Sequence, residues 1–148
     1  MGSQTALLCG VGANPGAINM ATEYERLDWK IRGGAEFIVT QPVFDLDLLE
    51  AFVTRVAPSG VPVIAGIWPL TSYRNAEFMV NELRVPVPEV FMERMRKADS
   101  ADKARAEGVA IAQEMVARCR PLVQGVQLSA PFGRYHLAIE VAKAIGSR

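Results

Sequence analysis

Residues 36–45 read Glu-Phe-Ile-Val-Thr-Gln-Pro-Val-Phe-Asp, and this segment gives the clearest indication of the fold class. Its first part, 36–40, is an almost continuous apolar run, which predicts a strand buried on both faces, as in a parallel sheet. Short runs of the same kind lie at residues 5–12, 61–67 and 123–128. The sequence therefore predicts four strands that run parallel to one another.

Helical patterns fill the intervals between these runs. Apolar residues at helical spacing, or a composition rich in alanine and glutamate, predict helices at residues 18–31, 46–56, 75–83, 88–96, 101–118 and 136–145. Asn19 or Thr22 is the expected cap of the first helix, and Gly33-Gly34 its end. The alternation of strands and helices predicts right-handed crossovers in an α/β fold. Two architectures fit: a small doubly wound sheet, or a segment of a (β/α)8 barrel.

Two features favour the (β/α)8 TIM-barrel type, with only its second half present. Polar or small residues cluster just past the carboxyl end of each predicted strand, and no strand has the pattern of a polar edge. A complete barrel takes about 250 residues, and this chain has 148. Half a barrel leaves two unpaired sheet edges, which must be covered. A complementary half-barrel or a second copy of the chain would cover them.

Composition excludes several classes of protein. The chain has 16 basic and 16 acidic residues and is 50% hydrophobic, which argues against disorder and against binding to nucleic acid. No apolar run approaches the ~20 residues that cross a membrane, and no secretory signal is visible. Cys9 and Cys119 lack metal-binding spacing, so we expect reduced thiols, no metal site and a cytoplasmic location. Residues 1–148 are interpreted as one unit, with residues 1–3 added for expression.

Ligands of parallel α/β folds bind outside the carboxyl ends of the strands. After the first strand, residues 10–16 form a glycine-rich turn that can approach phosphate. Its GxGxxxG spacing is not the dinucleotide fingerprint, and a turn with positive φ explains the glycines equally well. The following helix carries Glu23, Arg26 and Lys30. Their spacing fits either a solvated face or a grip on a phosphorylated cofactor.

The other strand ends carry amide, aromatic and cationic groups. Gln41 can donate and accept hydrogen bonds at once, which suits a planar heterocycle such as a pterin or flavin. Trp68 and Tyr73 can stack on an aromatic ligand or pack against their own loop. Arg134 can bind a carboxylate or phosphate, or simply face solvent. His136 has no nucleophile beside it and no carboxylate pair is visible, so we predict no catalytic residue in this chain.

The same strand ends carry the motifs of a known family. The matching stretches are GVGANPGAIN, EYERLDWKIRGGAEFIVTQPVFD, PVIAGIWPLTSYRNAEFMVNE, VPEVFMERM, EGVAIAQEM and VQGVQLSAPFGR. In these the chain resembles the second half of methylenetetrahydrofolate reductases, closest to the reductase part of bifunctional proteins fused to homocysteine S-methyltransferase. The resemblance implies barrel strands five to eight of a flavoprotein. Such an enzyme uses FAD and NADH or NADPH to make 5-methyltetrahydrofolate from 5,10-methylenetetrahydrofolate, in one-carbon metabolism and methionine biosynthesis.

The resemblance also implies roles for individual residues. Gln41 matches a glutamine that contacts the pterin and p-aminobenzoate region of the folate. Tyr73 matches an aromatic residue that stacks in the substrate and nicotinamide site, and Arg134 matches an arginine of the substrate site. The positions that line the adenosine and pyrophosphate of FAD correspond to Asn14, Ala17, Glu23, Arg26 and Lys30.

The family's general acid has no counterpart in this chain. It is a glutamate on the first barrel strand, and an aspartate near the flavin belongs to the fourth strand. The resemblance therefore implies that the isolated chain is inactive and that an upstream half-barrel completes it. Two rival hypotheses stay open: a non-catalytic homo-oligomer joined through exposed sheet edges, and a small doubly wound nucleotide-binding domain. The latter needs an acidic residue after the second strand, where Gln41 stands.

Overall fold

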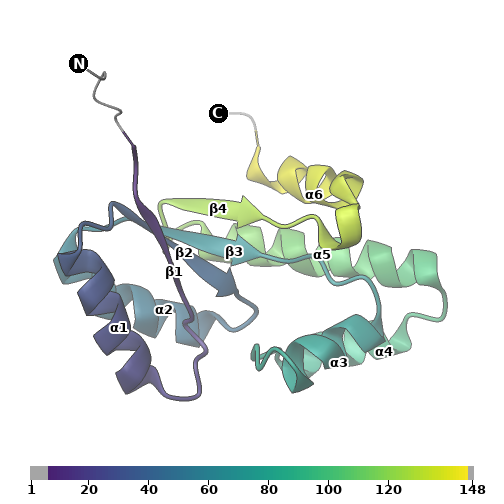
Figure 1. The fold of residues 1–148 in the computed structure, drawn as a ribbon. Coiled ribbons are helices and arrows are strands. Elements are labelled where there is room, and N and C mark those ends of the chain that lie inside the picture. The colour runs from purple at the N-terminus through teal and green to yellow at the C-terminus, as the bar shows by residue number, and fades with distance from the viewer. Residues whose placement is uncertain (1–6, 147–148) are drawn as a thin grey trace.

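The structure is a computed structural model that describes residues 7–146. The expected expression remnant, residues 1–3, and the start of the first predicted strand lie outside this range. The elements follow one another as β1 (Gly10–Ala13), α1 (Met20–Arg32), β2 (Phe37–Pro42), α2 (Leu46–Val56), β3 (Val63–Ile67), α3 (Tyr73–Asn81), α4 (Glu89–Lys97), α5 (Ala101–Cys119), β4 (Gly125–Leu128) and α6 (Tyr135–Ala142). Figure 1 shows their arrangement.

The strands form one parallel sheet in the order β1-β2-β3-β4. In a doubly wound sheet the strand order reverses at a switch point, where helices change face. Here every strand is added on the same side of the previous one, and right-handed crossovers then keep the helices on one face. The four-stranded segment of a (β/α)8-type barrel is therefore confirmed, and the doubly wound alternative is wrong.

Side-chain caps fix the starts of four helices. The side chains of Asn19, Asp45, Ser72 and Ser100 each accept a hydrogen bond from a backbone N–H in the first turn of α1, α2, α3 and α5. Such caps satisfy donors that have no partner within the helix. The cap of α1 is thus Asn19, one of the two residues that the sequence offered.

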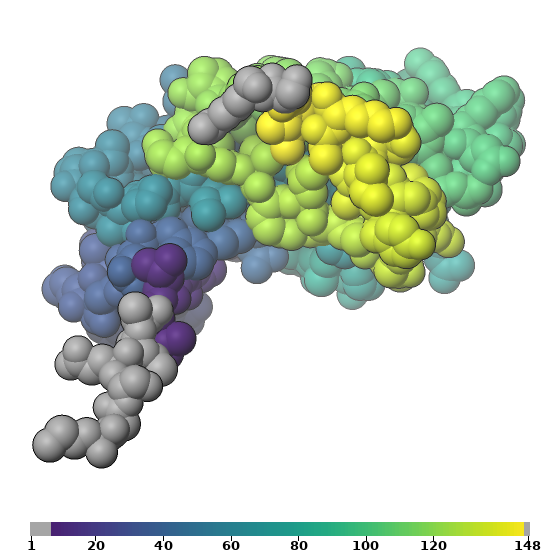
Figure 2. Space-filling view, turned by 90° about the horizontal axis from the view of Figure 1, so that it is seen from above, coloured from purple at the N-terminus to yellow at the C-terminus, as the bar shows by residue number. Residues whose placement is uncertain are grey.

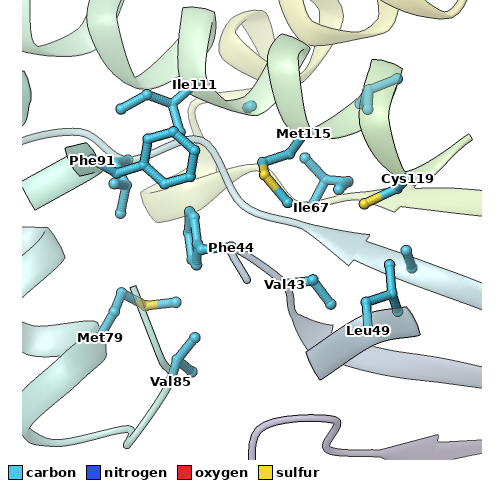
Figure 3. Close-up of a cluster of buried hydrophobic side chains, with 14 of the residues drawn as sticks. Val43, Phe44, Leu49, Ile67, Met79, Val85, Phe91, Ile111, Met115 and Cys119 are labelled. Atoms are coloured by element: carbon cyan, nitrogen blue, oxygen red, sulfur yellow. The ribbon is translucent and has the colours of Figure 1, made fainter. Parts of the chain in front are cut away.

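The core lies between the sheet and its helices. Ile38, Ala65 and Ile67 are buried and face the helical layer. Side chains from β3, α2, α3, α4, α5 and the loop after β2 converge there, as Figure 3 shows for Val43, Phe44, Leu49, Ile67, Met79, Val85, Phe91, Ile111, Met115 and Cys119. This core holds the helices against the strands, so the loops at the strand ends start from a fixed frame.

The outer strands are less covered than the sequence predicts. Ala13 is the only fully buried residue of β1 and β4 together, whereas continuous apolar runs predict burial on both faces. The reason is that both strands are sheet edges within residues 7–146, and one face of the sheet lacks a full helical layer. Figure 2 shows β4, in light green, at the surface beside α6 in yellow.

No helix in residues 7–146 is long and apolar enough to cross a membrane.

Candidate functional site

The carboxyl ends of all four strands lie along one edge of the sheet, because the strands are parallel. The predicted site residues follow these ends. Gln41 is the last residue but one of β2, Tyr73 begins α3 after β3, and Arg134 precedes α6 after β4 (Figure 1). The predicted cofactor residues follow β1 or lie on α1. The fold therefore places the predicted substrate residues and the predicted cofactor residues on segments that follow the carboxyl ends of the strands.

A β-bulge positions Gln41. Val39 pairs with Ile64 and Pro42 with Gly66, so β2 has one residue more than β3 between these pairs. Bulges of this kind re-aim side chains beside functional sites. Gln41 is exposed at this point, although Thr40 just before it is buried.

Thr40 and Gly66 hold the bulge together. The hydroxyl of Thr40 accepts a hydrogen bond from the N–H of Gly66 at 2.9 Å and donates to the carbonyl oxygen of Gln41 at 2.8 Å. A Cβ on Gly66 would lie 2.5 Å from the carbonyl oxygen of Thr40. Only glycine therefore allows the two backbones to approach so closely, and no sequence pattern signals this pairing.

The turn after β1 is organised around Asn14. Its backbone N–H donates to Oε1 of Glu23 at 2.8 Å, and its Oδ1 accepts from the N–H of Gly16 at 3.0 Å. The N–H of Ala17 donates to the carbonyl oxygen of Asn14 at 3.2 Å. Three of the five predicted cofactor residues, Asn14, Ala17 and Glu23, are thus joined in one hydrogen-bonded turn.

Lys30 reaches the same turn from α1. Its Nζ donates to the carbonyl oxygen of Gly12 at 2.6 Å and is exposed. Arg26, one turn earlier on α1, is exposed as well, and neither cation forms an ion pair with a carboxylate of residues 7–146. Two exposed cations beside a backbone turn fit the charge of a phosphate group.

Two of the three glycines in this turn allow close packing. Gly10, Gly12 and Gly16 all have ordinary negative φ, so the explanation from positive φ is wrong. A Cβ on Gly10 would overlap the ring of Phe37, and one on Gly16 would lie 2.6 Å from Pro86. A Cβ on Gly12 would meet nothing within 4 Å. Close packing therefore explains Gly10 and Gly16 but does not indicate a phosphate-binding loop. The argument for a phosphate rests on the two cations Arg26 and Lys30.

Tyr73 is held by a residue that sequence reasoning missed. Its hydroxyl accepts a hydrogen bond from Arg96 of α4 at 3.2 Å, and the guanidinium lies 5.1 Å from the centroid of the Tyr73 ring. The hydrogen bond to Tyr73 and that to Glu89 raise the pKa of Arg96 above its ordinary value. The half-buried ring is thus fixed against α4 on one side, a contact that no local pattern signals.

Trp68 and Arg134 differ in their surroundings. Trp68 is half-buried, and its Nε1 has no hydrogen-bond partner within the described part of the chain. Arg134 is exposed, with its guanidinium 5.9 Å from the centroid of the Phe132 ring. Trp68 packs against the hydrophobic core, whereas the guanidinium of Arg134 is accessible to a ligand.

The carboxylates near the strand ends already have structural partners. Asp45 caps α2 by accepting from the N–H groups of Asp47 and Leu48, and Glu23 accepts from Asn14. His136 is exposed on α6, in edge-to-face contact with Tyr135. Residues 7–146 contain no cluster of three metal-binding side chains. Within residues 7–146 the carboxylates of Asp45 and Glu23 are thus engaged by backbone N–H groups of the chain itself.

Two hollows lie outside the predicted residues. One, of about 280 Å³, is lined by residues of α3 and the turn after β4 at the same edge of the sheet. Another, of about 260 Å³, lies at the opposite edge beside Arg120 and Gln124. None of the eight predicted residues lines either hollow.

Comparison with known proteins relates the chain to one family. The family model described as methylenetetrahydrofolate reductase matches residues 12–130. Methylenetetrahydrofolate reductase 1 of Schizosaccharomyces pombe is 31% identical over 102 residues, covering 67% of this chain and 16% of that protein. A probable methylenetetrahydrofolate reductase (NADH) of rice is 27% identical over 107 residues, covering 70% and 18%. The chain thus spans about a sixth of the length of these relatives.

A solved structure has the same fold. It is an uncharacterized protein from Clostridium thermocellum that binds two copies of 5-methyl-5,6,7,8-tetrahydrofolic acid. The TM-score is 0.59 at 22% identity, and the match covers 94% of this chain but 53% of the other. Because the family model spans most of the sequence, the chain belongs to the methylenetetrahydrofolate reductase family.

Proposed function

We propose that this chain provides one side of the active site of a methylenetetrahydrofolate reductase, which makes 5-methyltetrahydrofolate for one-carbon metabolism and methionine biosynthesis. The observation that carries the proposal is the bulge that exposes Gln41 at the edge where Tyr73, Arg134 and Lys30 also lie. Family membership supports it. So does the folate bound by a protein of the same fold.

The folate is held by complementary polar and aromatic groups. The amide of Gln41 donates and accepts at once, so it distinguishes the edge of a pterin by the order of its donors and acceptors. The exposed guanidinium of Arg134 suits a carboxylate of the substrate. Tyr73, fixed by Arg96, offers a ring whose position is already set before the ligand arrives. A preformed arrangement of this kind lowers the entropy lost on binding.

The cations of α1 fit the phosphates of FAD. Lys30 and Arg26 are exposed and lack a carboxylate partner within residues 7–146, so their charge is available to a pyrophosphate. The turn of Asn14, Ala17 and Glu23 would then lie beside the adenosine. When bound, FAD supplies the hydride chemistry, with NADH or NADPH as its source of electrons. Two of the relatives are named for NADH.

The proposed reductase needs a second half. The strand-end carboxylates described above have structural partners, so a general acid must come from other residues. We assign the chain to strands five to eight and expect the isolated chain to be inactive. The two open sheet edges, β1 and β4, support an upstream half-barrel as the partner. Turnover by the chain alone, with FAD, NADH and folate supplied, would refute this division of roles.

Binding measurements test the two ligand assignments separately. Titration calorimetry of the chain with 5-methyltetrahydrofolate should show a loss of affinity for Gln41→Leu. Gln113→Leu, on α5, should bind as the unmodified chain does. Titration with FAD should show weaker, less salt-dependent binding for Lys30→Gln, whereas Lys143→Gln, just after α6, removes the same charge without effect. Equal losses in each pair would contradict the proposed roles.

The open edges also favour a second candidate, a non-catalytic homo-oligomer. Two copies can join β1 of one to β4 of the other and close a ring of strands. The uncovered face, however, carries Gly10, Gly12 and Gly125, so two copies would leave the interior of such a ring poorly filled. Size-exclusion chromatography with light scattering separates the cases. A folate-binding monomer contradicts the oligomer, and a dimer that binds neither ligand contradicts the reductase. The methyltransferase fusion and cytoplasmic location stay predictions.

A further inference from the structure

The connection between α3 and α4, residues 82–88, reaches the turn after β1. A Cβ on Gly16 would lie 2.6 Å from Cδ and 2.7 Å from Cγ of Pro86, which is closer than two such carbons can approach. Because Gly16 does not have a positive φ, its backbone would accept alanine. The close approach of Pro86, which is distant in the sequence, is therefore what requires glycine here.

Three segments of the chain meet at Pro86. They enclose a hollow of only about 10 Å³, no more than a single water molecule needs. The lining residues come from the turn after β1, from the end of β2 with the start of α2, and from Pro86. Three of them are Pro15, Pro42 and Pro86. Because a proline ring fixes φ and loses almost no side-chain entropy on burial, this contact is rigid.

The connection that carries Pro86 is anchored in the core. Val85 is 3% exposed, and its N–H donates to the carbonyl oxygen of Met79 at 2.9 Å. Figure 3 shows both side chains among the buried residues. Arg84 has a φ of 55°, a conformation that a residue other than glycine keeps only where the surrounding structure fixes it. The core therefore sets the position of Pro86.

Gly16 lies between two residues of the proposed cofactor site. Its N–H donates to Oδ1 of Asn14 at 3.0 Å, and the N–H of Ala17 donates to the carbonyl oxygen of Asn14 at 3.2 Å. A displacement of Gly16 would lengthen these bonds and move Asn14 and Ala17. Groups that bind a ligand must be held within about 0.5 Å of their productive positions. The ring of Pro86 blocks one direction of such a displacement.

We propose that Pro86 is a positioning residue for the cofactor turn, residues 14–17. It acts through Gly16 and not through contact with the cofactor. The core fixes Pro86, Pro86 fixes Gly16, and the turn then holds Asn14 and Ala17 ready for FAD. The identity of the ligand rests on the proposed function, whereas the support of the turn by Pro86 rests on the packing alone.

Titration of the chain with FAD tests this role with a matched pair of variants. Pro86→Ala removes the ring atoms next to Gly16 and should weaken FAD binding about 10-fold, the loss expected for one hydrogen bond. Pro62→Ala is the control, because Pro62 is also half-buried but precedes β3 at the opposite edge of the sheet. If the chain binds FAD and the two variants bind it equally well, the proposal is wrong.

A double variant separates positioning from a general loss of stability. Gly16→Ala forces a Cβ against the ring of Pro86 and should also weaken FAD binding. In Gly16→Ala/Pro86→Ala the colliding ring atoms are absent, so the added methyl group fits. The double variant should therefore bind FAD no more weakly than Pro86→Ala alone. Losses that simply add would show that the two positions act independently, which overturns the proposal.

Hydrogen exchange tests the support of the turn without any ligand. The N–H groups of Asn14 and Gly16 are both hydrogen-bonded within the turn. They should exchange about 10-fold faster in Pro86→Ala than in Pro62→Ala. The N–H of Ile111, in the middle of α5, serves as the reference for global unfolding in each variant.

The two measurements keep the positioning role and the cofactor role apart. If the chain binds no FAD but Pro86→Ala alone speeds exchange in the turn, the cofactor role fails and the positioning role holds. If the chain binds FAD and neither affinity nor exchange responds to Pro86→Ala, the positioning role fails and the cofactor role holds.

Discussion

Thr40→Val should destabilise the chain and loosen Gln41 together. Valine has the shape of threonine, so the core around position 40 keeps its volume. The lost hydroxyl leaves the buried N–H of Gly66 without its acceptor at 2.9 Å. An unsatisfied buried donor costs about 1–3 kcal/mol. With a urea dependence of roughly 1–3 kcal/mol/M for a small protein, the unfolding midpoint should fall by about 1 M.

Thr40→Ser is the control, because serine keeps the hydroxyl and loses one methyl group, a cost of about 1 kcal/mol. Urea unfolding gives the stability of each variant, and calorimetry gives its affinity for 5-methyltetrahydrofolate. We expect Thr40→Val to lose both stability and affinity, and Thr40→Ser to keep its affinity. If the valine variant binds folate as tightly as the serine variant does, the bulge does not position Gln41.

Three further outcomes follow from the packing of the core. Gly108→Ala should lower the free energy of unfolding, because its Cβ would overlap the carbonyl oxygen of Leu70. We expect a loss of about 2–4 kcal/mol in urea unfolding, which outweighs the gain of about 1 kcal/mol in helix propensity. The control is Gly125→Ala, whose Cβ meets only ordinary contacts and whose free energy of unfolding should stay near that of the unmodified chain. Cys9 is exposed and Cys119 buried, so a thiol reagent should label one cysteine at once and the second only on unfolding. Burial raises the pKa of Cys119 to about 11, above its value in the unfolded chain. The free energy of unfolding should therefore be unaffected by this thiol below pH 9 and should fall by about 2 kcal/mol between pH 9 and 11. Comparison with Cys119→Ala, which lacks the thiol, isolates this loss.

Local patterns predict the elements of this fold because their causes are local. The spacing of apolar residues gives α2 at residues 46–56, as the structure has it, and continuous apolar runs give the four parallel strands. Burial on both faces was predicted wrongly for β1 and β4. A hydrophobic run does not tell whether a strand has neighbours on both sides, and the unpaired edges expose these strands within residues 7–146.

The geometry of the candidate site depends on contacts that are distant in sequence. Thr40 and Gly66 are 26 positions apart, and Tyr73 and Arg96 are 23 positions apart. No periodicity relates such partners, so sequence reasoning finds Gln41 and Tyr73 from their place after a strand but not the residues that hold them.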